Sequence, residues 1–305
     1  MRARFPLGFT PQQSVTPQHS CTIRGHSVKS FFAIALTLSL SAQQSARLSA
    51  TEYDVYLLAG QSNMDGRGLT ADLTPEQQQP VDQCIIFYRN AIASSETWKP
   101  LAPGFSMPPR FKGPLPSPRF GPETGFARTM RADFPRQSLA LIKGSKGGTS
   151  LRADWKPGVK GKPETQGRQY RDFIETIRMA TEQLQQQGHQ CRIRGLLWHQ
   201  GESDAKQTQE TYRTQLTTFV ARIREDVGIA NLPIVTGEVF DNGKRDSVRA
   251  ATQDVAKADA TVAIVSAKDT TTWDKGTHFD ARSQLLLGER YARQMQRLQQ
   301  LQQAK

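Results

Sequence analysis

Residues Tyr53–Ala59 read YDVYLLA, a mostly apolar run that ends at Gly60 and leads into Gln61–Met64, QSNM. A short apolar run closed by glycine predicts a buried strand. Similar runs alternate with helical segments along the rest of the chain. Such alternation indicates a mostly parallel sheet with helices on both faces. We therefore expect an α/β fold, a three-layer sandwich whose reactive groups follow the carboxyl ends of the strands.

The remaining elements follow from the same kind of pattern. Further strands are expected at Ser138–Lys143, Arg194–His199, Pro233–Phe240 and Thr261–Ala267. Helices are expected over the apolar positions from Tyr170 to Leu184, which recur at three- and four-residue steps before Gly188, over Tyr212–Val227, and from Asp280 onward. Two long loops are expected at Asn90–Phe120 and Pro157–Gln169. One domain over residues 51–305 accounts for the whole pattern.

The first fifty residues differ in composition from the rest. They contain five Lys and Arg residues and no Asp or Glu, and Phe31–Ala42 is an uncharged apolar run. This pattern is typical of a secretory leader, so we expect a signal near residues 29–45 and export to the periplasm or the extracellular space. The run is short for a permanent membrane span, and we expect no stable membrane insertion after export. Either the leader is long or translation starts downstream of Met1; an uncleaved membrane anchor is the alternative.

The charge distribution argues against a nucleic-acid partner. The chain has 40 Lys and Arg against 28 Asp and Glu, a formal net charge of +12. Without the five basic residues of the leader the net charge is +7, and the excess is spread along the chain without a dense basic block. A mildly basic surface would favour acidic polysaccharides, since positive potential concentrates polyanions. The sequence leaves the oligomeric state open.

Cysteine and glycine patterns give no sign of a cofactor. Outside the leader only Cys84 and Cys191 are present, and the sequence favours neither a disulfide nor two free thiols. No CxxC motif or Cys/His cluster occurs, so we expect no metal site. The glycine-rich segment Gly144–Ser150 lacks the residue order of a phosphate-binding loop.

Ser62 stands where a nucleophile can be presented, directly after the first expected strand and beside glycine. A backbone N–H at such a turn can also stabilise an oxyanion. The simpler interpretation of a serine at this position is a helix cap. A serine hydrolase needs a histidine as proton acceptor, and outside the leader the chain has His189, His199 and His278. His189 lies in a polar helix end, which leaves His199 and His278 as candidates.

Four ordered motifs carry a resemblance to a known family. They are GQSNM at Gly60–Met64, GGTS at Gly147–Ser150, WHQGESD at Trp198–Asp204, and HFD at His278–Asp280 followed by SQLLLGERYA. Together they resemble the SGNH-hydrolase superfamily, and more closely its carbohydrate-esterase branch, which contains acetylxylan esterases and the sialate O-acetylesterase domain. The resemblance covers Tyr53 to Gln294 and implies a flavodoxin-like sheet.

The resemblance implies a role for each motif. Ser62 would be the nucleophile, and His278 would be the base that takes its proton. The oxyanion donors would be the Ser62 N–H, the N–H of a glycine in the Gly147–Gly148 turn, and the side-chain amide of Gln200. The substrate pocket is expected to be lined by Gln61, Asn63, Gly147, Glu202 and His199, with His199 packed beside Trp198.

The acid of the triad is where the chain departs from the family pattern. Most relatives place an Asp three residues before the base, and here that position is Lys275, which cannot accept a hydrogen bond from the imidazole. Asp274, one residue further back, is favoured. The alternatives are Glu202, a dyad held by a backbone carbonyl, or Asp280, which is more simply the N-cap of the last helix.

The implied activity is that of a metal-independent serine esterase, which removes acetyl groups from a poly- or oligosaccharide through an acetyl-enzyme on Ser62. Two alternatives stay open. A catalytically impaired carbohydrate-binding protein would explain the displaced acid at Lys275. A less specific short-chain carboxylesterase would need a more apolar approach to the site. Xylan, sialic acid and sulfated or pectic polymers are all open as the acetylated glycan.

Overall fold

The computed structural model describes residues 50–90, 93–106, 118–274 and 276–304. Every described residue belongs to one compact unit, Leu48–Lys305. The expected signal near residues 29–45, residues 107–117 of the first expected loop, and Lys275 lie outside the described residues. None of the described helices is long and apolar enough to cross a membrane.

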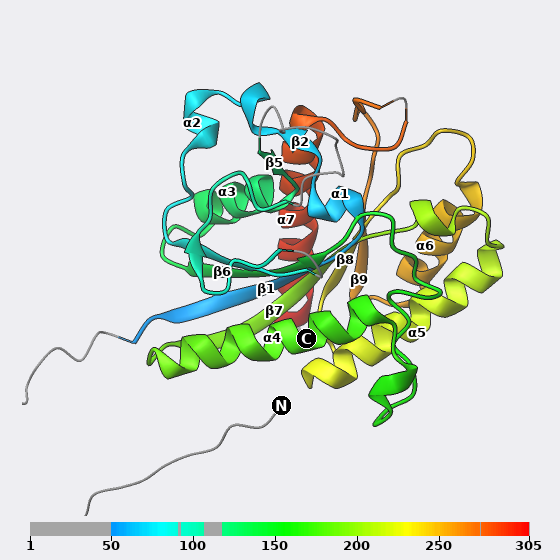
Figure 1. Ribbon diagram of the computed structural model, residues 1–305, viewed down its shortest axis with the longest axis horizontal. Helices are drawn as coiled ribbons and strands as arrows, with labels where there is room; N and C mark the ends of the chain where they lie inside the picture. The colour runs from blue at the N-terminus through cyan, green and yellow to red at the C-terminus, as the bar shows by residue number, and fades with distance from the viewer. Residues whose placement is uncertain (1–49, 91–92, 107–117, 275, 305) are drawn as a thin grey trace, which may run out of the picture. The chain divides into compact units, whose positions relative to one another are not determined.

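Strands and helices alternate along this unit (Figure 1). The strands are β1 (Glu52–Gly60), β2 (Gly68–Leu69), β3 (Cys84–Tyr88), β4 (Lys99–Pro100), β5 (Arg119–Phe120), β6 (Ser138–Ser145), β7 (Gln190–His199), β8 (Ile234–Gly237) and β9 (Val262–Val265). The α-helices are α1 (Ser62–Asp65), α2 (Pro75–Gln78), α3 (Glu123–Asp133), α4 (Arg168–Gln186), α5 (Gln209–Val227), α6 (Asp246–Ala258) and α7 (Ala281–Gln303). Three short 3-10 helices are η1 (Thr70–Asp72), η2 (Pro163–Thr165) and η3 (Glu202–Asp204).

Seven strands form one sheet in the order β4-β3-β6-β1-β7-β8-β9. Every neighbouring pair is parallel except β3 and β4. The chain passes from β1 out to β3, returns to β6, and then crosses to β7 on the other side of β1. The direction in which strands are added therefore reverses at β1. Open parallel sheets bind their ligands at such a point, beyond the carboxyl ends of the strands.

Alternate residues of β1 face opposite helical layers. Val55, Leu57 and Ala59 belong to an apolar cluster shared with α4, α5 and α6, whereas Tyr56 and Leu58 belong to one shared with α3 and α7. Figure 1 shows α3 and α7 on one face of the sheet and α4 and α5 on the other. All five side chains are at most 1% exposed, and burying a large apolar side chain stabilises a fold by about 1.5–3 kcal/mol. The continuous apolar run therefore reflects burial on both faces.

The predicted three-layer α/β fold is confirmed, and each predicted strand and helix is present with shifted ends. The strand order differs in one place from a flavodoxin-like sheet, where the first strand lies between the second and the third. Here β6 inserts between β3 and β1, so that β1 lies between β6 and β7. The sequence analysis did not predict β3, α3 or α6. The expected second loop contains η2 and gives way to α4 at Arg168.

Candidate active site

The carboxyl ends of three adjacent strands meet at Gly60. This residue is aligned with Ser145 at the end of β6 and with His199 at the end of β7. Its φ is 143°, and a Cβ atom at this position would lie 2.1 Å from His199 O, so only glycine fits. The segments that follow β1, β6 and β7 therefore begin side by side, although they are far apart in the chain.

Ser62 begins α1 directly after this turn and is 4% exposed. The short helix is anchored by Asp65, whose carboxylate accepts hydrogen bonds from Arg67 Nη1 at 2.6 Å and from Tyr88 Oη at 3.0 Å. Lys143 Nζ donates to Asp65 O at 2.8 Å. These buried contacts hold the residue expected to be the nucleophile against β3 and β6.

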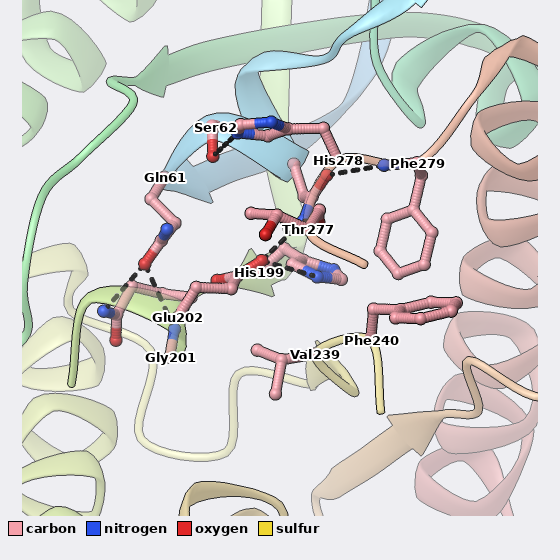
Figure 2. Close-up of polar contacts among 12 residues, drawn as sticks. Gln61, Ser62, His199, Gly201, Glu202, Val239, Phe240, Thr277, His278 and Phe279 are labelled. Carbon is pink, nitrogen blue, oxygen red and sulfur yellow. Dashed lines mark hydrogen bonds and ion pairs between the residues drawn. The ribbon is translucent and has the colours of Figure 1, made fainter. Parts of the chain in front are cut away.

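Ser62, His278 and Asp274 form a connected row. His278 Nε2 lies 3.0 Å from Ser62 Oγ, and Figure 2 shows the two side chains facing each other. His278 Nδ1 is hydrogen-bonded to Asp274 Oδ2, while Asp274 Oδ1 accepts from the His278 backbone N–H at 2.7 Å. The Asp274 carboxylate thus contacts both the backbone and the ring of His278. For this reason an acid four residues before the histidine can still contact its imidazole. Because Nδ1 faces a carboxylate, Nδ1 carries the proton and Nε2 is free to accept one from Ser62.

The other residues considered as the acid lie elsewhere. Glu202 Oε1 accepts from Asn63 Nδ2 and lies 3.9 Å from His199 Nε2. Asp280 accepts from the Ser283 N–H at 2.8 Å and is the N-cap of α7. Among the described residues, Asp274 is therefore the carboxylate that contacts the His278 imidazole.

The surroundings set the protonation of this pair. Burial lowers the pKa of His278 below its usual 6.5; Asp274 opposes that shift, and the charges of Arg67 and Arg119 add to it. Burial alone would raise the pKa of Asp274, but hydrogen bonds from the His278 and Thr277 N–H groups and the charge of His278 outweigh it and lower the pKa. At neutral pH the pair is a neutral imidazole beside a carboxylate, which is the state that a general base requires.

A glycine turn after β6 closes over Ser62. Gly147 lies against the serine, where a Cβ atom would be 3.3 Å from Ser62 Cβ and 2.8 Å from Arg67 Nη2. A side chain at Gly147 would thus collide with the site, whereas one at Gly148 would point into open space. Within the described part of the chain, the N–H groups of Ser62 and Gly148 donate to no protein acceptor. Both are available as oxyanion donors.

Gln200 is buried and its amide is fully engaged. Its Nε2 lies within hydrogen-bonding distance of Gln61 Oε1 at 3.1 Å, Thr149 O at 3.3 Å and Asp204 Oδ2 at 2.7 Å. Its Oε1 accepts from Tyr212 Oη at 2.9 Å. A primary amide has two N–H bonds, so none is left for an oxyanion. The contacts thus contradict the expected oxyanion role of Gln200, which instead joins the three strand ends.

Gln61 shows the opposite arrangement, with its oxygen used and its nitrogen free. Oε1 accepts from the backbone N–H groups of Gly201 and Ser203, both at 3.3 Å, and from Gln200 (Figure 2). Backbone N–H groups can only donate, which fixes the atom facing them as oxygen. Nε2 has no acceptor among the described residues. Gln61 is therefore the side-chain amide at this turn that has a donor to spare.

Three residues expected to line the substrate pocket are buried instead. Asn63 and His199 are each 1% exposed, and the side chain of Glu202 is 4% exposed. Burial lowers the pKa of His199 to about 3 and raises the pKa of Glu202. His199 Nδ1 lies 3.0 Å from Tyr291 Oη. These side chains form a packed layer beneath the Ser62 turn, and their contact with substrate stays a prediction.

The structure adds two residues that the motifs did not include. Trp273 is 48% exposed, and its ring stacks on His278 with 5.9 Å between centroids and 17° between planes. The guanidinium of Arg119 lies 5.0 Å from the Trp273 ring centroid. The described residues expose two other large hydrophobic side chains, Val159 and Leu301. Trp273 differs from both in contacting a residue of the site.

Potential metal ligands do not gather in the described ranges: no group of three or more His, Cys, Asp or Glu side chains is placed to hold an ion. Cys84 is buried in β3 and Cys191 is half-buried in β7. Both are free thiols, which settles the choice that the sequence left open.

Comparison with known proteins points to one family. The sequence model of the carbohydrate esterases described as sialic acid-specific acetylesterases matches residues 52–297. A probable carbohydrate esterase of Arabidopsis thaliana is 24% identical over 250 residues, which are 77% of this chain and 86% of that protein.

Solved structures show the same fold. An A. thaliana protein superposes with a TM-score of 0.63 at 20% identity, covering 81% of this chain and 98% of that one. A carbohydrate acetylesterase of Xanthomonas citri superposes with a TM-score of 0.59 at 18% identity, covering 80% of this chain and 56% of that one.

Proposed function

The chain belongs to the carbohydrate esterase family of sialic acid-specific acetylesterases, and we propose that it is a serine esterase that removes O-acetyl groups from carbohydrate through an acetyl-enzyme on Ser62. The observation that carries this proposal is the row of contacts from Ser62 Oγ through His278 to Asp274. A serine, a histidine with a free Nε2, and a carboxylate in that order are the parts that acyl transfer requires.

The chemistry proceeds in two steps. His278 Nε2 accepts the Ser62 proton while Oγ attacks the acetyl carbonyl carbon. The tetrahedral intermediate then expels the sugar oxygen, which takes the proton from His278. Water attacks acetyl-Ser62 with His278 again as base, so acetate and the free serine are formed. Asp274 holds the imidazole in the required tautomer and stabilises the imidazolium.

The oxyanion requires donors that are in place before the reaction. Ser62 N–H and Gly148 N–H supply two, because neither has an internal acceptor. We assign the third to Gln61 Nε2, because the Gln200 amide is consumed by its own contacts. Gln200 then acts by holding Gln61 Oε1, which turns Nε2 away from the loop after β7.

The surroundings of His278 favour an acidic sugar as the carrier of the acetyl group. The charges of Arg119 and of Arg67, which is paired with Asp65, lower the pKa of His278, so positive potential reaches the imidazole. A sugar carboxylate would be attracted there. Trp273 offers an exposed aromatic surface beside the base. An O-acetylated sialic acid meets both conditions, whereas an acetylated xylose unit carries no charge.

The alternative of a catalytically impaired binding protein loses its support. That alternative rested on Lys275, which occupies the position where most relatives have the acid of the triad. Because Asp274 reaches the imidazole from the neighbouring position, the displacement leaves the row of contacts intact.

The direct test measures acetate release from O-acetylated sialic acid, acetylated xylan and p-nitrophenyl acetate, by the wild type and by Ser62→Ala. We expect turnover of the sialic acid ester to exceed that of xylan. We expect Ser62→Ala to lose at least about 10³-fold in rate on every ester, with an unchanged circular dichroism spectrum. Retained turnover in this variant would reject the assignment of the nucleophile.

Export is proposed on the composition of the first fifty residues alone. A basic segment followed by the apolar run Phe31–Ala42 supports it. N-terminal sequencing of the protein recovered from outside the cytoplasm would locate a cleavage site, and recovery from the cytoplasm with residues 29–45 intact would contradict it.

A further inference from the structure

We propose that Asn63, oriented by Glu202, is a positioning residue that holds the loop carrying His278 in register with Ser62. The inference rests on the proposed function and deepens it. Ser62 and His278 are 216 positions apart, so something must keep them within bonding distance. In this proposal neither Asn63 nor Glu202 touches the substrate.

Asn63 binds the backbone on both sides of His278. Its Nδ2 donates to Thr277 O at 2.9 Å, and its Oδ1 accepts from the Phe279 N–H at 3.1 Å. Figure 2 shows Thr277 and Phe279 on either side of His278, close to Ser62. Because Asn63 follows Ser62 in α1, one residue supplies the nucleophile and the next holds its base.

Glu202 determines which way the Asn63 amide faces. Glu202 Oε1 accepts from Asn63 Nδ2 at 2.5 Å, so the two hydrogens of Nδ2 go to Glu202 and to Thr277 O. Turning the amide over would set Oδ1 against both of these acceptors and Nδ2 against the Phe279 N–H. The hydrogen bonds to Thr277 O and from the Phe279 N–H would be lost, so Asn63 would no longer hold the backbone on either side of His278.

Glu202 suits this role as a neutral acid. The Tyr291 hydroxyl donates its one hydrogen to Trp198 O at 2.9 Å, so it accepts a hydrogen bond from His199 Nδ1. The proton of the neutral His199 ring is therefore on Nδ1, and Nε2 has a lone pair. This Nε2 atom lies 3.9 Å from Glu202 Oε1. Glu202 Oε2 and His199 Nε2 are buried and have no hydrogen-bond partner among the described residues. An ionised Glu202 would set a negatively charged oxygen against the Nε2 lone pair, which is unfavourable. A protonated Glu202 would set an O–H group near Nε2, which is an acceptor. Burial, which raises the pKa of Glu202, favours the protonated form.

A second contact supports the loop without fixing His278. Arg245, at the start of α6, donates from Nη1 to Gly276 O at 3.0 Å and from Nη2 to Thr277 Oγ1 at 3.1 Å. These bonds reach only the side of the loop before His278. Loss of the Asn63 amide is therefore expected to displace the imidazole locally while the loop stays folded.

The experiment compares Asn63→Ala with Asn242→Ala in the full chain, using p-nitrophenyl acetate. Asn242 is a matched control because it donates to Gly276 O at 3.3 Å in the same loop, whereas its hydrogen bonds among the described residues do not include Thr277 or Phe279. We expect Asn63→Ala to lower kcat about 10–100-fold with KM within about threefold, because a displacement of about 1 Å costs about that much and no binding contact is removed. Asn242→Ala should leave both constants within about threefold of the wild type.

Two variants of Glu202 separate orientation from packing and do not depend on how Asn63→Ala folds. Glu202→Gln is neutral and keeps an oxygen that can accept from Asn63, so most of kcat should remain. Glu202→Ala removes that acceptor and should lower kcat to the level of Asn63→Ala. The rate at which a fluorophosphonate labels Ser62 should follow kcat across the series.

The proposal is overturned if folded Asn63→Ala keeps kcat within about threefold of the wild type, or if its KM rises while kcat holds, which would indicate substrate binding. Equal losses in Glu202→Gln and Glu202→Ala would overturn the role of Glu202. Failure of the proposed function looks different, because the wild type itself would then neither hydrolyse the ester nor react with the fluorophosphonate.

Discussion

The end of β7 with the loop that follows it, and the loop before α7, both contact the turn that carries Ser62, and each region carries a histidine and a carboxylate. In the first region the side chains of His199 and Glu202 are 1% and 4% exposed and lie 3.9 Å apart. In the second the side chains of His278 and Asp274 are 25% and 22% exposed and are hydrogen-bonded. The two pairs have the same chemical groups in different surroundings.

The difference shows that surroundings, not residue type, separate the structural pair from the reactive one. Burial lowers the pKa of His199 to about 3, so its imidazole is neutral near neutral pH, and burial raises the pKa of Glu202. Asp274 accepts hydrogen bonds from two backbone N–H groups and stays ionised. It polarises the His278 imidazole, whose other nitrogen faces the Ser62 hydroxyl. The first pair supports the site, and the second carries out proton transfer.

Exchanging a carboxylate for an amide in each loop should give the largest contrast. Asp274→Asn is expected to lower kcat about 10³–10⁴-fold. The backbone N–H groups of Thr277 and His278 would keep the Asn oxygen, so its NH₂ would face Nδ1 and move the imidazole proton to Nε2. Glu202→Gln should change kcat far less. Steady-state kinetics on p-nitrophenyl acetate measure both, and the reverse order of effects would make Glu202 the acid of the triad.

The pH dependence of kcat/KM should follow the ionisation of His278 alone. His278 must be neutral to accept a proton, so kcat/KM should fall as the pH drops through its pKa, and the midpoint should lie below 6.5. In Asp274→Asn the residual activity should have a still lower midpoint, because the carboxylate that opposes the shift is gone. A wild-type midpoint at or above 6.5 in a profile of initial rates would contradict this description of the site.

The smallest effect is expected for substitution of Trp273, the exposed residue in the loop that carries His278. Trp273→Ala should raise KM for a sugar ester about three- to tenfold, the range expected for loss of one aromatic contact, and should leave KM for p-nitrophenyl acetate nearly unchanged. Trp273→Phe should restore most of the affinity. If both substrates weaken equally, Trp273 acts through its stacking on His278 and not through the sugar.

The sequence analysis predicted the central strand from its continuous apolar run, but it missed β3, whose residues CIIFY are also mostly apolar, and it missed the helices α3 and α6. Residues 55–59 are apolar and buried on both faces of the sheet, and β1 is the central strand. The buried positions of α6 do recur at helical spacing, but they are occupied by small or polar residues as well as valine, and α3 contains Gly125 inside its turns. Both helices are stabilised mainly by packing against a face of the sheet, which the local sequence pattern does not reveal.

Within the site, the family resemblance predicted the contact between Ser62 and His278, and the spacing favoured Asp274, whereas the hydrogen bonds that engage Gln200 could not be predicted. Asp274 was favoured because it is four residues from His278, although the spacing could not show how the carboxylate turns back. The loss of Gln200 as a donor depends on Gln61, Thr149 and Asp204, which come from three strand ends. Trp273 was overlooked even though an aromatic residue directly before the expected acid was a readable signal.

The most direct test of the account is to mix the protein with p-nitrophenyl acetate, stop the reaction with acid, and map acetylated peptides by mass spectrometry. Acid protonates His278, which blocks the step in which water removes the acetyl group. We predict a single acetyl group on the peptide that contains Ser62 and none in Ser62→Ala. An acetyl group on another residue only, or turnover without any acetylated peptide, would contradict the account.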